Sequence, residues 1–128
     1  MQRVSDVTYF LLRLVMGFLF FCHGAQKILH WFGGAGQPVH GIALVSGWIE
    51  LVVGLLVFFG IATRVAGFIG AGEMAVAYFM VHQSMGPLPI QNHGELAVIY
   101  CFVLLFIAAH GPRLWAIDSV IRTGPRRV

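Results

Sequence analysis

The sequence predicts an all-α fold, a transmembrane bundle of four helices that forms a single domain over residues 1–128. Of its residues, 59% are apolar and only 10% are charged, against about 25% charged in a typical soluble domain. The apolar residues gather in four long runs, separated by short segments rich in Gly, Pro and polar residues, as in helices that cross a bilayer. So few charges could not cover the surface of a soluble bundle, so we expect the chain to lie in a lipid bilayer.

The first half of the chain predicts two of these helices. The first covers residues 7–29, and a Gly-rich loop follows over residues 30–41, with aromatic side chains suited to the membrane interface. The second helix covers residues 42–59. Residues 60–63 (Gly-Ile-Ala-Thr) are too few for anything but a tight turn, so the next helix should run antiparallel to the second.

The second half predicts two more helices. The third covers residues 64–82, with Thr63 as a candidate N-cap, because its hydroxyl can accept a hydrogen bond from a free N–H of the first turn. Two prolines prevent a continuous helix through residues 83–93. The fourth helix covers residues 93–110, with Asn92 as a candidate N-cap.

The end of the chain adds a weaker element. Residues 114–121 are a candidate surface helix, anchored at the interface by Trp115. The fully apolar part of the fourth helix, residues 96–109, spans only about 21 Å at 1.5 Å per residue, against about 30 Å for a hydrocarbon core. We therefore expect this helix to tilt little or the bilayer to thin around it.

Basic residues predict the orientation. The loops at residues 31–41 and 83–93 contain no Lys or Arg, whereas cytoplasmic loops usually carry an excess of both. This places both termini in the cytoplasm. The net charge of +3 does not indicate nucleic acid, because no aromatic or Gly-rich binding stretch accompanies the basic residues. Six arginines fall on the predicted cytoplasmic side: Arg3, Arg64, Arg113, Arg122, Arg126 and Arg127.

Two glutamates inside apolar runs are the leading candidates for a functional site. Glu50 and Glu73 are about equally far from the turn that joins the second and third helices, so both should lie about 14 Å below the outer face. Each lies on a helical face of small residues, so both should point into the bundle. Charged groups in a membrane are costly and mark functional sites by default. Two carboxylates at one level also need a cationic partner or a shared proton.

Polar residues of the other helices could complete a pocket in the outer half. His23 and Lys27 of the first helix are four residues apart and share a face. His23 should lie near the level of the two glutamates and Lys27 near that of Glu95. Arg13 either snorkels to the inner surface or reaches towards the glutamates. The candidate pocket residues are His23, Lys27, Glu50, Glu73, Glu95, Asn92 and Arg13, with His82 as a further neighbour.

Simpler interpretations accompany each of these residues. The charged network could only fix the helices in register, and the histidines could be ordinary interface residues. Cys22 and Cys101 lie in apolar runs without CxxC spacing, so we interpret them as packing residues. A redox pair between them remains an alternative. We predict no metal site, because no local His and Cys spacing supports one.

The ordered motifs of the chain resemble the DoxX family of membrane proteins. They are Leu-Arg-Leu-Val-Met-Gly at residues 12–17, His23-Gly24-x-x-Lys27, Glu50-x3-Gly54, and Ala-Gly-Glu-Met-Ala-Val-Ala-Tyr-Phe at residues 71–79. Asn92-x-Gly94-Glu95-Leu96-Ala97 follows, with His93 where the family motif has a second Gly. The resemblance implies a four-helix protein of the inner membrane. Members of the family are similar to the membrane subunit of thiosulfate:quinone oxidoreductase, and others are linked to membrane-bound oxidative-stress complexes with thiol-related enzymes.

Three functions are therefore in view. The first is an integral membrane subunit of a redox or oxidative-stress system, in which the pocket binds a quinone head group and a partner protein or the cysteines supply electrons. The second is a transporter or channel for a small solute or protons. The third is a scaffold without chemistry, whose small-residue faces could also serve a homo-oligomer.

Overall fold

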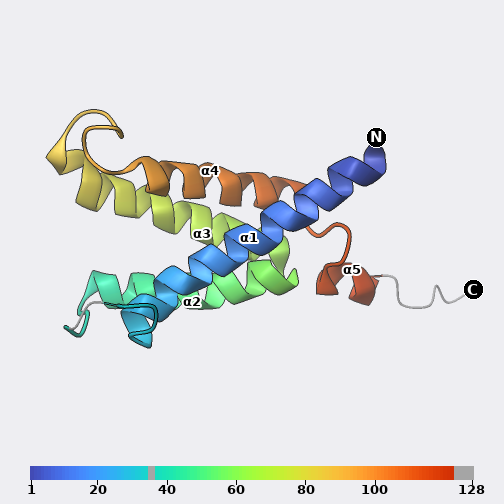
Figure 1. Cartoon of the computed structure of the whole chain (residues 1–128), viewed down its shortest axis with the longest axis horizontal. Helices are drawn as coiled ribbons and strands as arrows, with labels where there is room; N and C mark the ends of the chain where they lie inside the picture. Colours follow the sequence, from blue (N-terminus) through green and yellow to red (C-terminus); the bar gives the residue numbers. More distant parts are fainter. Residues whose placement is uncertain (35–36, 123–128) are drawn as a thin grey trace, which may run out of the picture.

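The computed structural model describes residues 1–34 and 37–122, and this part of the chain is entirely helices, turns and loops (Figure 1). Three helical stretches are long and apolar enough to cross a membrane: Gln2–Ile28, Ile42–Phe59 and Thr63–Met85. A shorter apolar helix, Glu95–His110, packs beside the third. The elements in order are α1 (Gln2–Ile28), α2 (Ile42–Phe59), α3 (Thr63–Ala77), the π-helical turn η1 (Tyr78–His82), the 3₁₀ turn η2 (Gln83–Met85), α4 (Glu95–His110) and α5 (Ile117–Arg122).

Helix boundaries differ from the prediction where the backbone leaves the helical region. α4 begins at Glu95 rather than at residue 93, because His93 has a left-handed φ of 59°. α5 begins at Ile117 rather than at residue 114, because Trp115 likewise has a φ of 52°. α1 instead begins earlier than predicted, at Gln2, since the polar residues before the apolar run contain no helix breaker.

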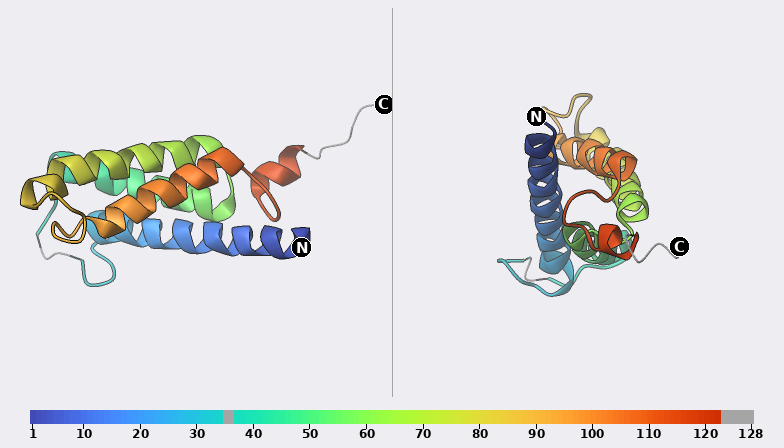
Figure 2. Two further views of the ribbon diagram at one scale, coloured as in Figure 1. Left: turned by 90° about the horizontal axis from the view of Figure 1, so that it is seen from above. Right: turned by 90° about the vertical axis from the view of Figure 1, so that its right-hand side faces the viewer.

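The helices form two close pairs, α1 with α2 and α3 with α4 (Figures 1 and 2). Glycines allow the backbones of α1 and α2 to touch. A Cβ on Gly17 would lie 2.5 Å from the backbone nitrogen of Phe58, and a Cβ on Gly54 would overlap the backbone of Phe21. Small residues that permit such approach are typical of helix contacts in membranes.

The two pairs meet around an apolar core and then separate. Phe20, Val57, Leu104 and Ile107 are completely buried between them. α2 and α3 are joined by a turn at one end and diverge towards the other (Figure 1). We call the end with this turn and α5 the turn end, and the opposite end, with the loops after α1 and η2, the loop end.

Polar contacts fasten α5 to the turn end. The carboxylate of Asp118 accepts hydrogen bonds from the backbone nitrogens of Ala62 and Thr63, each at 2.9 Å, and from the Thr63 hydroxyl at 3.0 Å. Asp118 thus satisfies the free N–H groups at the start of α3. Thr63 is therefore not the N-cap predicted from the sequence: the N-cap position is Ala62, which has no side chain able to cap.

Candidate functional site

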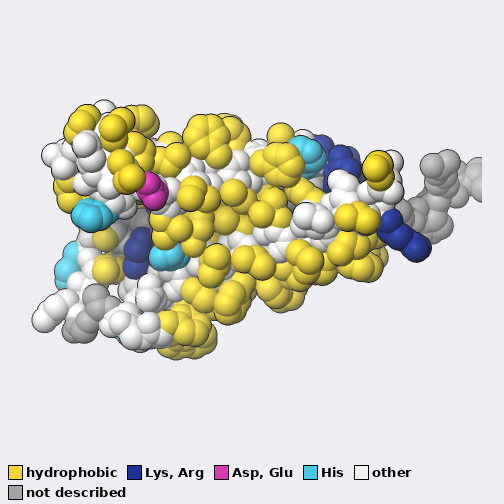
Figure 3. Space-filling view, turned by 45° about the horizontal axis from the view of Figure 1, so that its top comes forward, with side chains coloured by type: hydrophobic (Ala, Val, Ile, Leu, Met, Phe, Trp, Pro, Cys, Tyr) yellow, Lys and Arg dark blue, Asp and Glu magenta, His cyan; other side chains and the backbone are white. Residues whose placement is uncertain are grey.

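A cavity of about 630 Å³ lies between the two helix pairs at the loop end. Its walls are mostly apolar and come from α1, α2, α3 with η1, and α4. In the space-filling view, basic, acidic and histidine side chains gather around a hollow at this end, while the flank of the molecule is hydrophobic (Figure 3). The polar side chains of the lining are His23, Lys27, Ser46, Glu50, Glu73, His82, His93 and Tyr100.

Four of these residues form a continuous polar chain, Glu50–Lys27–Ser46–Glu73. The Lys27 Nζ lies 2.8 Å from Glu50 Oε2 and 2.9 Å from Glu50 Oε1. It also donates to the Ser46 hydroxyl at 2.9 Å, and that hydroxyl donates to Glu73 Oε1 at 2.7 Å. The chain thus connects α1 and α2 to α3 across the cavity wall.

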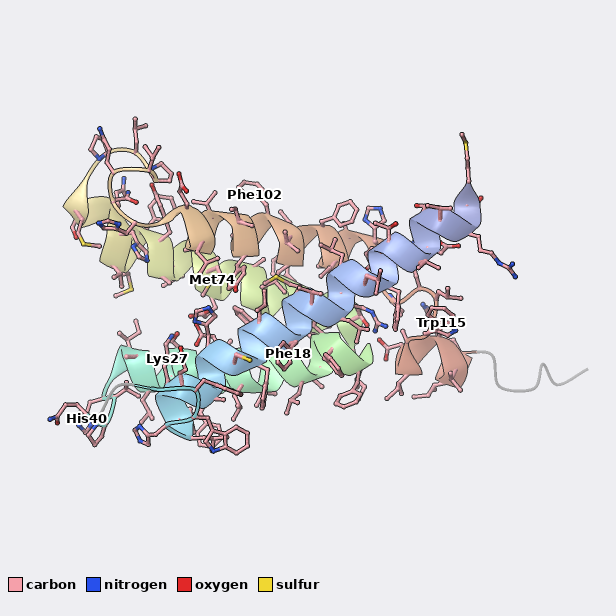
Figure 4. All side chains as sticks on the ribbon, in the orientation of Figure 1. Phe18, Lys27, His40, Met74, Phe102 and Trp115 are labelled. Atoms are coloured by element: carbon pink, nitrogen blue, oxygen red, sulfur yellow. The ribbon has the colours of Figure 1, made fainter. Side chains whose placement is uncertain are left out.

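Helical spacing explains how these side chains meet. Ser46 and Glu50 are four residues apart on α2, so both face the same neighbour, and the α1–α2 contact brings Lys27 between them. Glu73 comes from α3, on the other helix pair. Figure 4 shows Lys27 on the α1–α2 pair and Met74, the neighbour of Glu73, on the opposite one.

The charges of the polar chain do not balance. One lysine faces two glutamates, and Glu50 is only 3% exposed. The second carboxylate oxygen of Glu73, Oε2, is buried and has no hydrogen-bond partner among the described residues. Because an unpaired buried charge is costly, a proton on Glu73 or a hydrogen-bond donor in the cavity would stabilise this oxygen. The cavity is therefore suited to a ligand that exchanges protons or donates a hydrogen bond.

Aromatic and histidine side chains form the rest of the polar lining. The His23 ring lies 5.6 Å from that of Tyr100 in an edge-to-face contact. His82 and His93 line the cavity nearer the loop end, and the His82 Nδ1 lies 3.1 Å from the backbone oxygen of Asn92. The structure thus adds Ser46 and Tyr100 to the residues predicted from the sequence. Ser46 could have been found from its position one turn before Glu50.

Three predicted pocket residues lie outside the cavity lining: Asn92, Glu95 and Arg13. Asn92 is completely buried and holds the loop together: its side chain donates to Tyr78 Oη and the Gly86 carbonyl and accepts from the Gly94 nitrogen. Glu95 is exposed at the start of α4, and Lys27 pairs with Glu50 instead. Depth along the helix could not reveal this, because it does not fix the direction of a side chain.

Arg13 lies far from the polar chain, at the turn end. It is 1% exposed, donates to the Trp115 carbonyl at 2.9 Å and lies over the Phe10 ring. It is ten residues before His23, or about 15 Å along the helix axis. Arg13 therefore fastens the segment before α5, and it does not reach towards the glutamates.

Cysteine pairing and a metal cluster are not features of the described residues. Cys22 and Cys101 are free and partly buried. No group of three His, Cys, Asp or Glu residues within residues 1–34 and 37–122 is placed to hold a metal ion.

The protein has three apolar helices that are long enough to cross a membrane, and its polar residues line an apolar cavity. These features define a small membrane protein. The sequence profile of the DoxX family matches residues 8–83, and the chain belongs to this family. This confirms the resemblance expected from the motifs.

Two relatives cover nearly the whole chain. An uncharacterized protein of Haemophilus influenzae is 40% identical over 120 residues, which is 87% of this chain and 90% of the relative. The putative oxidoreductase CatD of Bacillus subtilis is 30% identical over 132 residues, 98% of this chain and 96% of the relative. No solved structure matches the chain.

Proposed function

We propose that this protein is a membrane-embedded component of a redox system and that its cavity binds a quinone head group. The similarity to a putative oxidoreductase supports the redox assignment. The observation that carries the binding proposal is the polar chain of Lys27, Ser46, Glu50 and Glu73 in the wall of an apolar cavity of about 630 Å³. Small-molecule sites typically combine an apolar wall with a few convergent polar groups in this way.

The lysine supplies a donor for a quinone carbonyl. An ammonium group has three N–H donors, and Glu50 and Ser46 use two of them. The third can point to a carbonyl oxygen in the cavity. The same charge stabilises the negative charge that builds up on this oxygen when the ring is reduced.

Glu73 supplies the protons in this proposal. Reduction of a quinone to the hydroquinone takes up two electrons and two protons. Glu73 ends the polar chain with a buried free oxygen, and each of the two protons would pass through it in turn to the head group. The electrons would come from a partner protein that contains a redox centre, and this partner is part of the proposal.

The same proposal includes the membrane arrangement. α4 has 16 residues, about 24 Å at 1.5 Å per residue, and would be the fourth span if the bilayer thins around it. The arginines at the turn end support an orientation with both termini in the cytoplasm of a bacterial inner membrane. The cavity then lies in the outer half of the bilayer. Reporter fusions at the C-terminus and in the loop at residues 83–94 test this placement.

A binding assay in lipid nanodiscs tests the head-group site. We expect Lys27→Met and Glu73→Gln to lower the affinity for a quinone analogue at least tenfold, because the first removes the N–H donor for the carbonyl and the second removes the carboxyl group that exchanges a proton with the head group. Glu95→Gln is the matched control: it makes the same chemical change on an exposed residue outside the lining, and it should leave binding unchanged. Equal binding by all three variants would contradict the proposal.

The packing of the turn end supports a one-sided site over a transport path. A solute would have to pass Phe20, Val57, Leu104 and Ile107, all completely buried. The scaffold alternative is tested by the double variant Lys27→Met/Glu50→Leu, which replaces the ion pair by apolar side chains. A scaffold would then still fold and assemble, whereas a quinone site would lose its ligand.

A further inference from the structure

We infer that the cavity opens sideways into the bilayer between α2 and α3, and that its ligand carries an apolar chain that lies in this opening. The inference rests on the proposed head-group site and adds the class of ligand: a quinone with an alkyl or isoprenoid chain. The ligand enters from the hydrocarbon layer with its ring towards Lys27.

The first support is the exposure of the lining on one side. Residues of α2, α3 and η1 that line the cavity are also widely exposed on the outside of the bundle, so the same side chains border the cavity and the lipid. Ile42 is 59% exposed and Met80 is 58% exposed. The members of this rim are Ile42 and Val45 on α2, Ile69, Gly72 and Val76 on α3, and Met80 on η1.

The second support is the chemistry of the rim. None of its members can form a side-chain hydrogen bond, whereas the polar chain lies on the cavity wall nearer α1. An amphiphile matches this division, because its head can reach Lys27 while its tail crosses an apolar edge.

The third support is Gly72. It is exposed, lines the cavity, and a Cβ built on it would meet no atom within 4 Å. By contrast, Gly17, Gly24 and Gly54 are required by backbone contact. Helix packing does not explain a glycine at position 72, in the interior of α3, where glycine weakens a helix relative to alanine. The space it leaves is the place for the chain of the ligand.

Two quinones with the same ring, one with a decyl chain and one with a methyl group in its place, test the inference in nanodiscs. We expect the wild type to bind the decyl quinone at least tenfold more tightly. Gly72→Trp should remove this difference by filling the opening, and Gly72→Leu should reduce it. The control is Leu55→Trp, on an exposed position of α2 outside the lining, and it should keep the wild-type preference.

The outcomes separate this inference from the proposed function. Equal affinity of the wild type for both quinones, or an unchanged preference in Gly72→Trp, would overturn the sideways opening and leave the head-group site intact. If neither quinone binds, the proposed function is wrong. In that case, a photoreactive alkyl diazirine that lacks a quinone ring tests the opening. Labelling of the rim in the wild type that is lost in Gly72→Trp supports the opening, and an unlabelled rim overturns it.

Discussion

Lys27 is the residue on which the polar chain depends. It is the only cation that contacts Glu50 among the described residues, and it also orients the Ser46 hydroxyl that donates to Glu73. A buried carboxylate without its cation is strongly destabilising, whereas an apolar pair of similar volume often is not. Lys27 and Glu50 therefore each require the other for the fold to be stable.

Lys27→Met should lower the free energy of unfolding by about 3 kcal/mol, because it leaves the Glu50 carboxylate buried without a partner. We take the lower end of the range because the Lys27 side chain is 32% exposed and water can reach it. Unfolding by heat or denaturant in detergent micelles measures the change. Adding Glu50→Leu should restore most of the lost stability, and a double variant as unstable as Lys27→Met would contradict this account.

At the scale of elements, the contact between α1 and α2 decides where the cavity can form. Their glycines let the two backbones touch, which holds Lys27, Ser46 and Glu50 in one wall. Dispersion between closely packed backbones is a main source of helix association in lipid, where apolar side chains gain little by leaving the solvent. A wider contact would separate Lys27 from Glu50.

Gly54→Ala should therefore destabilise the protein by about 1–3 kcal/mol, because the new methyl group meets the backbone of Phe21 rather than a flexible side chain. The matched control is Gly72→Ala, the same substitution at an open helical position. It should stabilise by about 0.5–1 kcal/mol. Opposite shifts of the unfolding midpoint in detergent are expected, and a neutral Gly54→Ala would show that the helix contact is loose.

At the scale of the whole molecule, α5 ties together elements far apart in the sequence. Asp118 binds the start of α3, and its own backbone nitrogen donates to the Gly60 carbonyl at 2.9 Å. Arg13 of α1 holds the Trp115 carbonyl nearby. The turn end is thus closed by polar contacts, while the loop end holds the cavity.

The stability that these contacts give the turn end should depend on pH through Asp118. Burial by itself would raise the pKa of this carboxyl, but hydrogen bonds from Thr63 and Ala62 and the charge of Arg122 outweigh it and hold the pKa below its ordinary value. A lowered pKa in the folded state means that the stabilisation is fully present above the ordinary value of about 3.9 and is lost as the pH falls through the folded value.

Asp118→Asn should lower stability by about 1 kcal/mol at pH 7, the usual size of a helix cap. The difference from the wild type should stay constant down to about pH 4 and shrink below it. Unfolding midpoints of both proteins across this range provide the measurement. A difference that grows as the pH falls would contradict the capping role.

The sequence by itself determined the class of the protein, because a chain with this composition can bury its apolar helices only in lipid. It also predicted that Glu50, Glu73, Lys27 and His23 share one pocket, since charge and helical spacing are local properties, and all four line the cavity. Only the tertiary structure decided which side chains meet: Lys27 with Glu50 rather than Glu95, Asp118 rather than Thr63 at the start of α3, and Arg13 away from the cavity. Such contacts depend on how each helix is rotated about its axis, and close packing between helices sets that rotation.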